Sequence, residues 1–347
     1  MINLVKPGWK AGKEKRFLDF VNNIGNARAI LLSHVTDLDG VTSAKIVDDV
    51  LGPRVIRFLD YDQLNSNLVA ELKKEGFTKI VLTDLYIKNI EFVNELEKFA
   101  EVLIIDHHPM QIDYNSSRTV FMNAQGYSAA YLCYYLFSKI KDLEKYDWLV
   151  ACATVSDFMR LRAKKWLNEV YSKYGDTYVS KGKEVKESGV MWELLTNLSL
   201  AIAYFKPKTG RVFDSIGPNF GDIGDLRKYS DAVKNEIGVI ESKFEKEKEE
   251  FSGGYFFQFE CIFPIRSLLI TEVSMRMKDR IIMILEKKGD FISISARRQD
   301  EKVDLNKLLP KLVEGFQNSS AGGHKGAAGA TFPSEYLEEF KNRLRNL

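Results

Sequence analysis

The chain has 347 residues, of which 45% are hydrophobic and 28% are charged, a composition typical of folded globular proteins. Its 50 Lys and Arg residues nearly balance its 48 Asp and Glu residues, so any nucleic-acid-binding surface must be a local one. The three cysteines have no metal-type spacing, the N-terminal segment lacks the apolar core of a signal peptide, and no apolar run approaches the roughly 20 residues that span a bilayer. We therefore expect a cytoplasmic protein of two domains with no membrane partner.

The first half of the chain alternates short apolar runs with helical patterns. The segments 89–101, 128–140 and 148–158 have the apolar spacing of helices. Near-continuous apolar strands separated by helices predict an α/β fold, with a parallel sheet that helices cover on both faces. The predicted strands are 27–35, 53–60, 78–85 and 101–108.

The second half of the chain changes character. Residues 160–188 carry an excess of Lys and Arg, which we interpret as a solvated insertion, with a phosphate-attracting lid as the alternative. Residues 225–250 predict a long connecting helix, and the residues after it predict a smaller α+β domain. The predicted boundaries are a first domain at 1–200, a helical linker at 201–254 and a second domain at 255–347.

Acidic and histidine side chains follow three of the four predicted strands, and one more acid lies in the helix predicted at 148–158. In a parallel sheet the carboxyl ends of the strands meet at one edge, where ligands bind. We therefore expect these side chains to converge there. They are His34, Asp37 and Asp39 after the first strand, Asp84 after the third, Asp106, His107 and His108 after the fourth, and Asp157 in the helix.

Such a group of carboxylates is unfavourable unless cations neutralise it. Oxygen ligands with one or two imidazoles suit Mn²⁺ or Mg²⁺ better than a structural zinc, which favours thiolates. Four aspartates and two histidines suffice for two metal ions with one bridging carboxylate. A two-metal site of this kind indicates hydrolysis of a phosphate ester or anhydride.

The C-terminal part holds a second candidate site. Gly322, Gly323, His324 and Lys325 predict a glycine-rich turn whose backbone N–H groups approach an anion closely, although a plain turn has the same pattern. Upstream, a predicted strand ends in Arg297 and Arg298, and a guanidinium fork is well shaped for phosphate.

With these motifs in order, the sequence resembles the DHH phosphoesterase superfamily with its DHH-associated C-terminal domain, of the nano-RNase or archaeal RecJ-like exonuclease type. TDLDG, LTDL, DHHP and VSDF resemble the four motifs of the catalytic domain. SISARR, VDLNKLL and GGHKGAAG resemble the signature of the associated domain. The resemblance covers nearly the whole chain and implies that 1–200 is catalytic and 255–347 binds substrate.

The resemblance also implies roles for single residues. Asp84 would bridge the two metal ions, His108 would contact the scissile phosphate or assist the leaving oxygen, and Asp106 would orient the histidine pair. His34 is a further candidate ligand, although its offset from Asp37 differs from that of family members with a histidine in the first motif. The full implied metal set is Asp37, Asp39, Asp84, His107, Asp157 and His34, and the substrate set is Arg297, Arg298, Gly322, Gly323, His324 and Lys325.

The function implied is a Mn²⁺-dependent phosphodiesterase, with Mg²⁺ or Co²⁺ as substitutes, that removes mononucleotides from short single-stranded RNA or DNA. Basic residues at Arg160, Arg162, Lys164 and Lys165 would follow the backbone of such a strand. The alternatives are a phosphatase for 3′-phosphoadenosine 5′-phosphate, a cyclic-dinucleotide phosphodiesterase and a non-catalytic scaffold, against which the intact acids argue. RNA against DNA preference, polarity, substrate length and homodimer formation stay open.

Overall fold

The computed structural model describes residues 2–178, 180–181, 184–185 and 187–346. The chain divides into two compact units, Met1–Asp231 (unit 1) and Ala232–Leu347 (unit 2). The division falls within helix α10 (Leu226–Glu247), inside the segment 201–254 that the sequence indicates as a linker.

Unit 1 is built on a parallel sheet, as the apolar strand pattern predicts. Its described residues form five strands in the order β2-β1-β3-β4-β5, and every neighbouring pair is parallel. The sequence interpretation did not include β5, a strand of five residues that is buried throughout. The strands are β1 (Ala29–His34), β2 (Val55–Leu59), β3 (Lys79–Thr83), β4 (Glu101–Asp106) and β5 (Thr119–Asn123).

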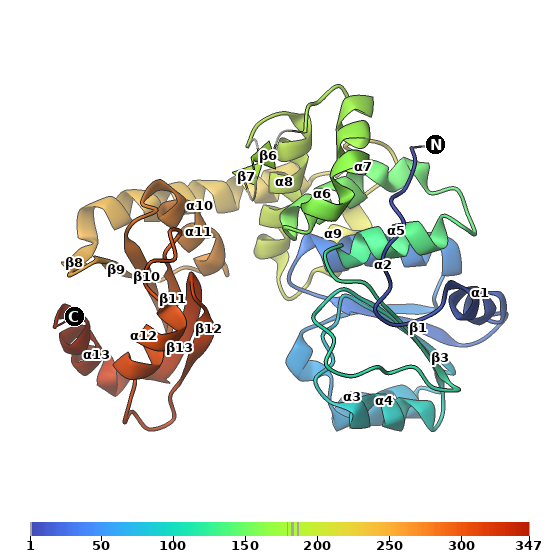
Figure 1. The fold of residues 1–347 in the computed structure, drawn as a ribbon, viewed down its shortest axis with the longest axis horizontal. Helices are drawn as coiled ribbons and strands as arrows, with labels where there is room; N and C mark the ends of the chain where they lie inside the picture. The colour runs from blue at the N-terminus through green and yellow to red at the C-terminus, as the bar shows by residue number, and fades with distance from the viewer. Residues whose placement is uncertain (1, 179, 182–183, 186, 347) are drawn as a thin grey trace. The chain divides into compact units, whose positions relative to one another are not determined.

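Helices cover both faces of this sheet, which confirms the predicted α/β fold class. Figure 1 shows α2 and α5 on one face and α3 and α4 on the other. Successive residues of a strand point to opposite faces of the sheet. Leu31 and Val81 therefore pack in one hydrophobic cluster, and Ile30 and Ile80 pack in another. The covering helices are α2 (Leu38–Leu51), α3 (Ser66–Lys74), α4 (Ile90–Glu97) and α5 (Ala129–Phe137).

A helical layer lies behind α2 and α5, and one of its members corrects the sequence interpretation. Helix α7 starts the stretch read as a solvated insertion, yet Trp166 and Leu167 are fully buried in it, because apolar residues at helical spacing face the core. Residues 179, 182, 183 and 186 of that stretch lie outside the described residues. The remaining elements of unit 1 are α1 (Glu14–Asn22), α6 (Asp147–Ser156), α7 (Arg160–Lys173), α8 (Val190–Phe205), α9 (Gly210–Ser215), β6 (Ser180–Lys181) and β7 (Glu184–Val185).

Unit 2 is the smaller α+β part. Its described residues form a mixed sheet in the order β12-β13-β11-β10-β9-β8, in which only the β9–β10 pair is parallel. Helices α12 and α13 pack on one face through Leu309 and Phe340. The elements are β8 (Glu249–Phe251), β9 (Gly254–Phe259), α11 (Arg266–Arg276), β10 (Ile281–Lys288), β11 (Phe291–Arg297), α12 (Leu305–Leu312), β12 (Ser320–His324), β13 (Ala327–Pro333) and α13 (Leu337–Arg345).

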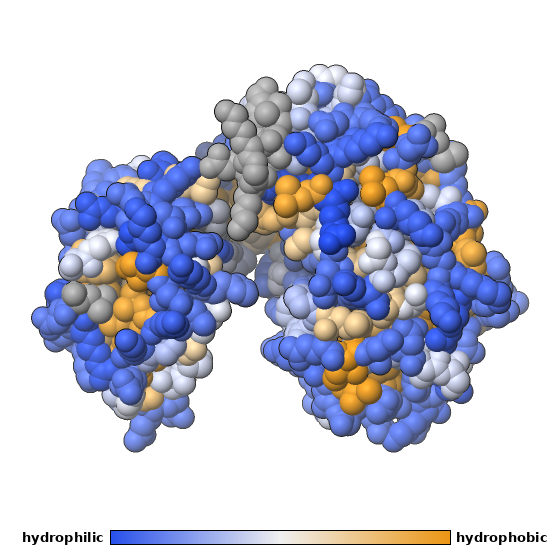
Figure 2. All heavy atoms as spheres, viewed as in Figure 1, coloured by the Kyte–Doolittle hydropathy of each residue, from blue (hydrophilic) through white to orange (hydrophobic). Residues whose placement is uncertain are grey.

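Among the described residues, no helix is both long enough and apolar enough to cross a membrane. Figure 2 shows one face of the molecule, on which hydrophobic residues are scattered within a mainly hydrophilic surface.

Candidate metal centre

The junction between β1 and α2 places the first candidate ligands. Asp37 is the N-cap of α2 and accepts a hydrogen bond from the Gly40 N–H at 3.0 Å. Its second oxygen lies 2.9 Å from Nδ1 of His34, the last residue of β1. Position 40 requires glycine, because a Cβ there would lie 2.3 Å from the His34 carbonyl oxygen. The tight turn therefore brings His34 and Asp37 together.

Burial and charge decide the protonation of this first pair. Burial of the His34 imidazole opposes its protonation, but Asp37 and Asp84 outweigh it and raise the pKa of His34 to about 10. Burial of Asp37 acts in the opposite sense to His34, and the imidazole prevails, so the pKa of Asp37 falls to about 2. In the metal-free protein the pair is therefore an ion pair.

Asp39 lies in the first turn of α2 and is 1% exposed. Its carboxylate accepts hydrogen bonds from the N–H groups of Ala129 at 2.7 Å and Ala130 at 2.8 Å. These are the first two residues of α5, whose amides lack partners within the helix. Burial, together with the Asp84 and Asp157 carboxylates, nevertheless holds the pKa of Asp39 well above its ordinary value. The side chain is thus fixed in place but electrostatically unfavourable as an anion.

Asp84 follows β3 and lies between two histidines. Its Oδ1 is 3.3 Å from Nε2 of His107, and its Oδ2 is 3.7 Å from Nδ1 of His34. Its backbone φ of 57° is in the left-handed region, which costs a residue other than glycine on the order of 1–3 kcal/mol. Such strain concentrates at functional sites, and here it directs a buried carboxylate into the centre of the acid cluster.

His107, directly after β4, and Asp157, directly after α6, complete the cluster. Nε2 of the buried His107 lies 3.6 Å from Asp157 and 3.7 Å from Asp39. Burial and the Asp84 carboxylate raise the pKa of Asp157 to about 7, although His107 acts against them. Burial of His107 opposes its protonation, but the surrounding carboxylates outweigh it and raise its pKa.

The six side chains therefore form two neighbouring groups, of which Asp84 is the shared centre. His34, Asp37 and Asp84 offer ligand atoms that all lie within 4.8 Å of one another, and so do Asp39, His107 and Asp157. Among the described residues, Oδ2 of Asp84 and Oδ2 of Asp157 are buried without a hydrogen-bond donor. Uncompensated carboxylate oxygens with imidazole nitrogens fit hard or borderline divalent cations. The structure brings together all six residues of the predicted metal set.

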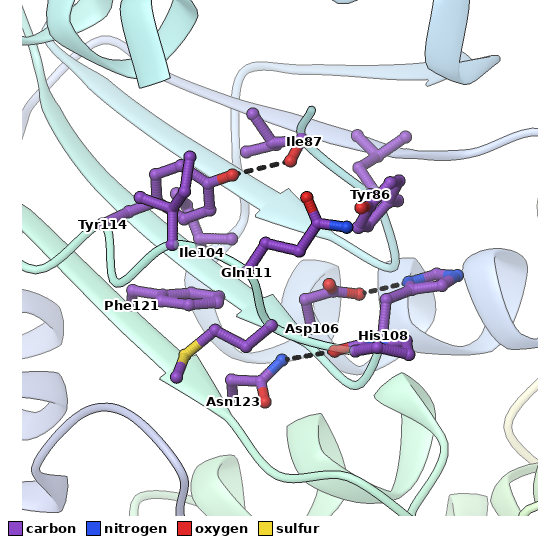
Figure 3. A pocket seen from close by; sticks show the side chains of 13 residues that line it. Tyr86, Ile87, Ile104, Asp106, His108, Gln111, Tyr114, Phe121 and Asn123 are labelled. Carbon is purple, nitrogen blue, oxygen red and sulfur yellow. Dashed lines mark hydrogen bonds and ion pairs between the residues drawn. The ribbon is translucent and has the colours of Figure 1, made fainter. Parts of the chain in front are cut away.

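The second histidine of the pair borders this cluster, because Asp84, Asp106, His107 and His108 also offer potential ligand atoms that all lie within 4.8 Å of one another. Nδ1 of His108 donates a hydrogen bond to Asp106 at 2.7 Å, and the His108 carbonyl oxygen accepts one from Asn123 at 3.1 Å, as Figure 3 shows. Burial opposes the ionisation of Asp106 and the protonation of His108, but each partner outweighs it, so the pKa of Asp106 is lowered and that of His108 is raised. Asp106 thus orients His108, while the His107 ring turns toward Asp84.

Tyr61 is a site residue that the sequence did not suggest. It follows β2, so it lies at the same sheet edge as the acids, and its position after a strand was the available signal. Its ring stacks on His34 with centroids 4.4 Å apart, and its hydroxyl lies 3.2 Å from Nε2 of His108.

In unit 2, Arg297 and His324 flank the same residue. Arg297 on β11 and His324 on β12 both pair with Ala327 on β13, so the two side chains lie on one face of the sheet. Gly322 pairs with Gly329 on that face, so no side chain extends from the sheet at these two positions. Arg298 is different, because its guanidinium forms a fork with Asp300 at 2.6 and 3.2 Å.

The glycine-rich segment is mostly strand rather than the predicted turn. Gly322, Gly323 and His324 belong to β12, and only Lys325 and Gly326 form the turn to β13. Position 323 requires glycine, because its φ is 149° and a Cβ would lie 2.5 Å from the Ala327 carbonyl oxygen. The N–H of Gly323 donates to the Asn306 side chain at 2.8 Å. Close backbone packing thus explains part of a motif that we interpreted as anion binding.

Comparison with known proteins follows the same division. Residues 28–155 match the family model described as the DHH family, N-terminal domain, and residues 267–347 match the DHHA1 domain. No curated protein matches the sequence significantly.

Solved structures with this fold include exonucleases and a phosphodiesterase. RecJ from Thermus thermophilus in complex with Mn²⁺ is 16% identical with a TM-score of 0.67, and the match covers 100% of this chain but only 55% of that one. An exonuclease RecJ bound to manganese is 16% identical with a TM-score of 0.66, covering 100% and 96% of the two chains. A pGpG-specific phosphodiesterase from Vibrio is 13% identical with a TM-score of 0.52, covering 92% and 97%. At these identities the likeness concerns the fold.

Proposed function

The chain belongs to the DHH phosphoesterase superfamily and carries a C-terminal DHHA1 domain, and we propose that it is a divalent-metal-dependent phosphodiesterase that removes mononucleotides from short single-stranded oligonucleotides. The observation that carries the proposal is the position of Asp84 between the two groups of ligands. This geometry suits a pair of Mn²⁺ ions with a bridging carboxylate, with Mg²⁺ or Co²⁺ as substitutes.

His34, Asp37, Asp39, Asp84, His107 and Asp157 would hold the two ions. Bound there, such ions supply activation of a water molecule and neutralisation of the phosphate charge. In the hydrolysis, a bond forms between the water oxygen and phosphorus, and the bond from phosphorus to the leaving oxygen breaks. The leaving oxygen takes a proton from His108, and the proton that the water loses passes to solvent, from which His108 is reprotonated.

His108 is suited to this role by its contacts. Asp106 accepts the hydrogen bond from Nδ1, which leaves Nε2 as the atom that exchanges a proton. The carboxylate also stabilises the imidazolium, because it outweighs burial and raises the pKa of His108. In the metal-free protein the imidazole is therefore protonated over a wider pH range than a free histidine.

The start of α7 favours an oligonucleotide over a small nucleotide. Phe158 follows Asp157 directly, is 68% exposed and has a φ of 58°. The Arg160 guanidinium lies 5.2 Å from its ring, so one face of the ring is supported and the ring is suited to stack on a base. Arg160 itself is 3% exposed, so it supports Phe158 and does not follow a phosphate backbone as the sequence suggested.

Exposed basic residues continue from this ring. Arg162, Lys164 and Lys165 are all exposed on α7. The Arg162 side chain lies against Gly126 in the loop after β5, since a Cβ at Gly126 would be 2.6 Å from Arg162 Nε. A track of cations beside a metal centre attracts the successive phosphates of a strand, whereas a small nucleotide needs no such track.

An activity panel tests the proposal. The full chain, stripped with a chelator and reloaded with Mn²⁺, Mg²⁺ or Co²⁺, is given 5′- and 3′-labelled RNA and DNA of roughly two to 20 nucleotides. The same preparations are given 3′-phosphoadenosine 5′-phosphate, cyclic di-AMP and its linear product. We expect release of mononucleotides from the oligomers only when metal is present. Faster turnover of the small nucleotides than of the oligomers would favour the alternative function, hydrolysis of small nucleotides. No hydrolysis of any substrate with any metal would refute both functions.

In unit 2, we propose that Arg297 and His324 contact the phosphates or bases of the substrate, with Gly322, Gly323 and Lys325 beside them. The support is the shared face of Arg297 and His324 and the low surface at Gly322. Arg298 is the weaker member of the predicted set, because Asp300 already occupies its guanidinium fork.

A further inference from the structure

A capped turn fixes the backbone at Tyr61. Tyr61 begins a short 3₁₀ helix, Tyr61–Gln63, whose cap is Asp60. The Asp60 carboxylate accepts from the Tyr61 N–H at 2.9 Å, and the Gln63 side chain accepts from the Asp60 N–H at 2.7 Å. This reciprocal capping fixes the backbone from which the aromatic side chain extends.

The ring of Tyr61 is parallel to the imidazole of His34. The interplanar angle is 14° at a centroid distance of 4.4 Å. His34 also has the Thr36 hydroxyl 3.0 Å from its Nε2, while its Nδ1 faces Asp37 and Asp84. The stack prevents the imidazole from tilting out of the plane in which Nδ1 meets the carboxylates.

The hydroxyl of the same side chain meets the other site histidine. Tyr61 Oη lies 3.2 Å from Nε2 of His108. A neutral imidazole accepts from the hydroxyl there, and an imidazolium donates to it, so the direction of Nε2 is fixed in both states. The opposite ring nitrogen is bound to Asp106, so the His108 ring is held at two points.

We propose that Tyr61 is a positioning residue with two separable parts, in which the ring orients His34 for metal binding and the hydroxyl orients His108 for proton donation. The His108 part rests on the proposed function, whereas the His34 part requires only that the protein binds a divalent cation. No substrate contact is assigned to Tyr61. The leaving oxygen of the substrate would replace the hydroxyl at Nε2 and so find the imidazole already aligned.

Tyr86 provides the matched control. Its ring centroid lies 5.6 Å from that of His108 at 48°, so it is equally aromatic and close to the same side chain. Among the described residues, its hydroxyl makes no hydrogen bond to His108, whose Nε2 is taken by Tyr61.

The experiment compares Tyr61→Phe, Tyr61→Leu and Tyr86→Phe in the full chain. Tyr61→Phe keeps the stack and removes the hydroxyl, so we expect kcat to fall about 10- to 100-fold with Mn²⁺ affinity by calorimetry unchanged. Tyr61→Leu also removes the stack, so Mn²⁺ binding should weaken by about 10-fold or more. Tyr86→Phe should match the parent protein in both measurements, and thermal denaturation establishes that each variant is folded.

The pH dependence of kcat separates positioning from a general structural effect. Loss of a partner at Nε2 should change the pKa of His108 and so shift the limb of the kcat–pH profile that reports its protonation. A loosened fold should lower kcat at every pH without shifting that limb. Wild-type kcat and an unmoved limb in Tyr61→Phe would refute the hydroxyl part, and equal Mn²⁺ affinity in Tyr61→Leu and Tyr61→Phe would refute the ring part. If the parent protein hydrolyses no phosphodiester, the proposed function fails, while the comparison of Mn²⁺ affinities still decides the ring part.

Discussion

Oδ1 of Asp84 lies 3.3 Å from Nε2 of His107. The two residues directly follow neighbouring parallel strands, β3 and β4, so the sheet itself sets their separation. Because the other oxygen of Asp84 faces His34, a single carboxylate connects the two groups of ligand atoms. Metal binding at one group of ligand atoms should therefore depend on the other group.

Replacing Asp84 with Asn should test this connection most directly. The amide keeps the shape of the side chain but can neither bridge two cations nor neutralise them. We expect a loss of hydrolysis of at least about 10²- to 10³-fold, and fewer Mn²⁺ ions bound per chain in calorimetry. Asp19→Asn is the control, because Asp19 is an exposed acid on α1 that pairs with Lys15. Unchanged stoichiometry in Asp84→Asn would contradict the bridging role.

Above pH 3.8 the metal-free protein should lose the stability that Asp157 and His34 contribute as the pH rises. The folded pKa of Asp157 is about 7 against an unfolded value of 3.8, and that of His34 is about 10 against 6.5. Protons bind more tightly to both groups in the folded chain, so their contribution to stability is complete at low pH. Asp157 loses it between pH 3.8 and about 7, and His34 between pH 6.5 and about 10.

A divalent cation replaces those protons, so its stabilising effect should show the opposite trend. We expect the increase in Tm on adding Mn²⁺ to be larger at pH 8 than at pH 6, because fewer protons compete for the ligands. Thermal denaturation at both pH values, with and without Mn²⁺, provides the measurement. An equal Tm increase at the two pH values would show that Asp157 and His34 do not exchange protons for metal.

Substitution of Phe158 should affect oligonucleotides selectively. If the exposed ring stacks on a base, Phe158→Ala should raise KM by about 5- to 140-fold, the equivalent of about 1–3 kcal/mol per base. An abasic oligonucleotide should show no such difference between variant and parent. Leu161→Ala is the matched control, since Leu161 is 65% exposed and apolar but has no ring. An equal effect on both oligonucleotides would exclude base stacking.

The adjacent arginines of unit 2 should differ in their effect on binding. Within the described residues, the Arg297 guanidinium has no hydrogen-bond or ion-pair partner, and burial lowers its pKa, whereas Arg298 is bound to Asp300. Arg297→Ala should raise KM about 12- to 140-fold, as expected for a lost hydrogen bond to a charged group of about 1.5–3 kcal/mol. Arg298→Ala should change KM by less. The reverse ranking in steady-state kinetics would place the phosphate contact at Arg298.

The sequence was sufficient to predict which acids converge. Asp37, Asp84 and His107 follow strands, and parallel strands bring their carboxyl ends to one edge irrespective of the strand order. The order of the strands in the sheet could not be read from the sequence, and for this reason Tyr61 was missed. Its contacts with His34 and His108 require β2 to lie beside β1 and a capped turn to follow β2.

Two interpretations of local sequence patterns differ from the structure, one in the GGHKG segment and one in α7. The GGHKG segment has the composition of a turn, but Gly323 lies in a strand where neighbouring backbone excludes a side chain. The charge count of α7 concealed an apolar stripe that includes Trp166, because the count disregards which face each residue occupies. At Gly323 the deciding contacts come from Ala327 and Ala328 on the paired strand β13, and in α7 they come from the core that Trp166 faces.

The two amide contacts of Asp39 complicate the interpretation of mutants at that position. An asparagine would have to present its NH₂ group to one of the N–H groups of Ala129 and Ala130, so two donors would face each other in the core. The substitution commonly regarded as isosteric would then disturb the first turn of α5 as well as the ligand set. Loss of activity in Asp39→Asn would therefore not distinguish a missing ligand from a displaced helix.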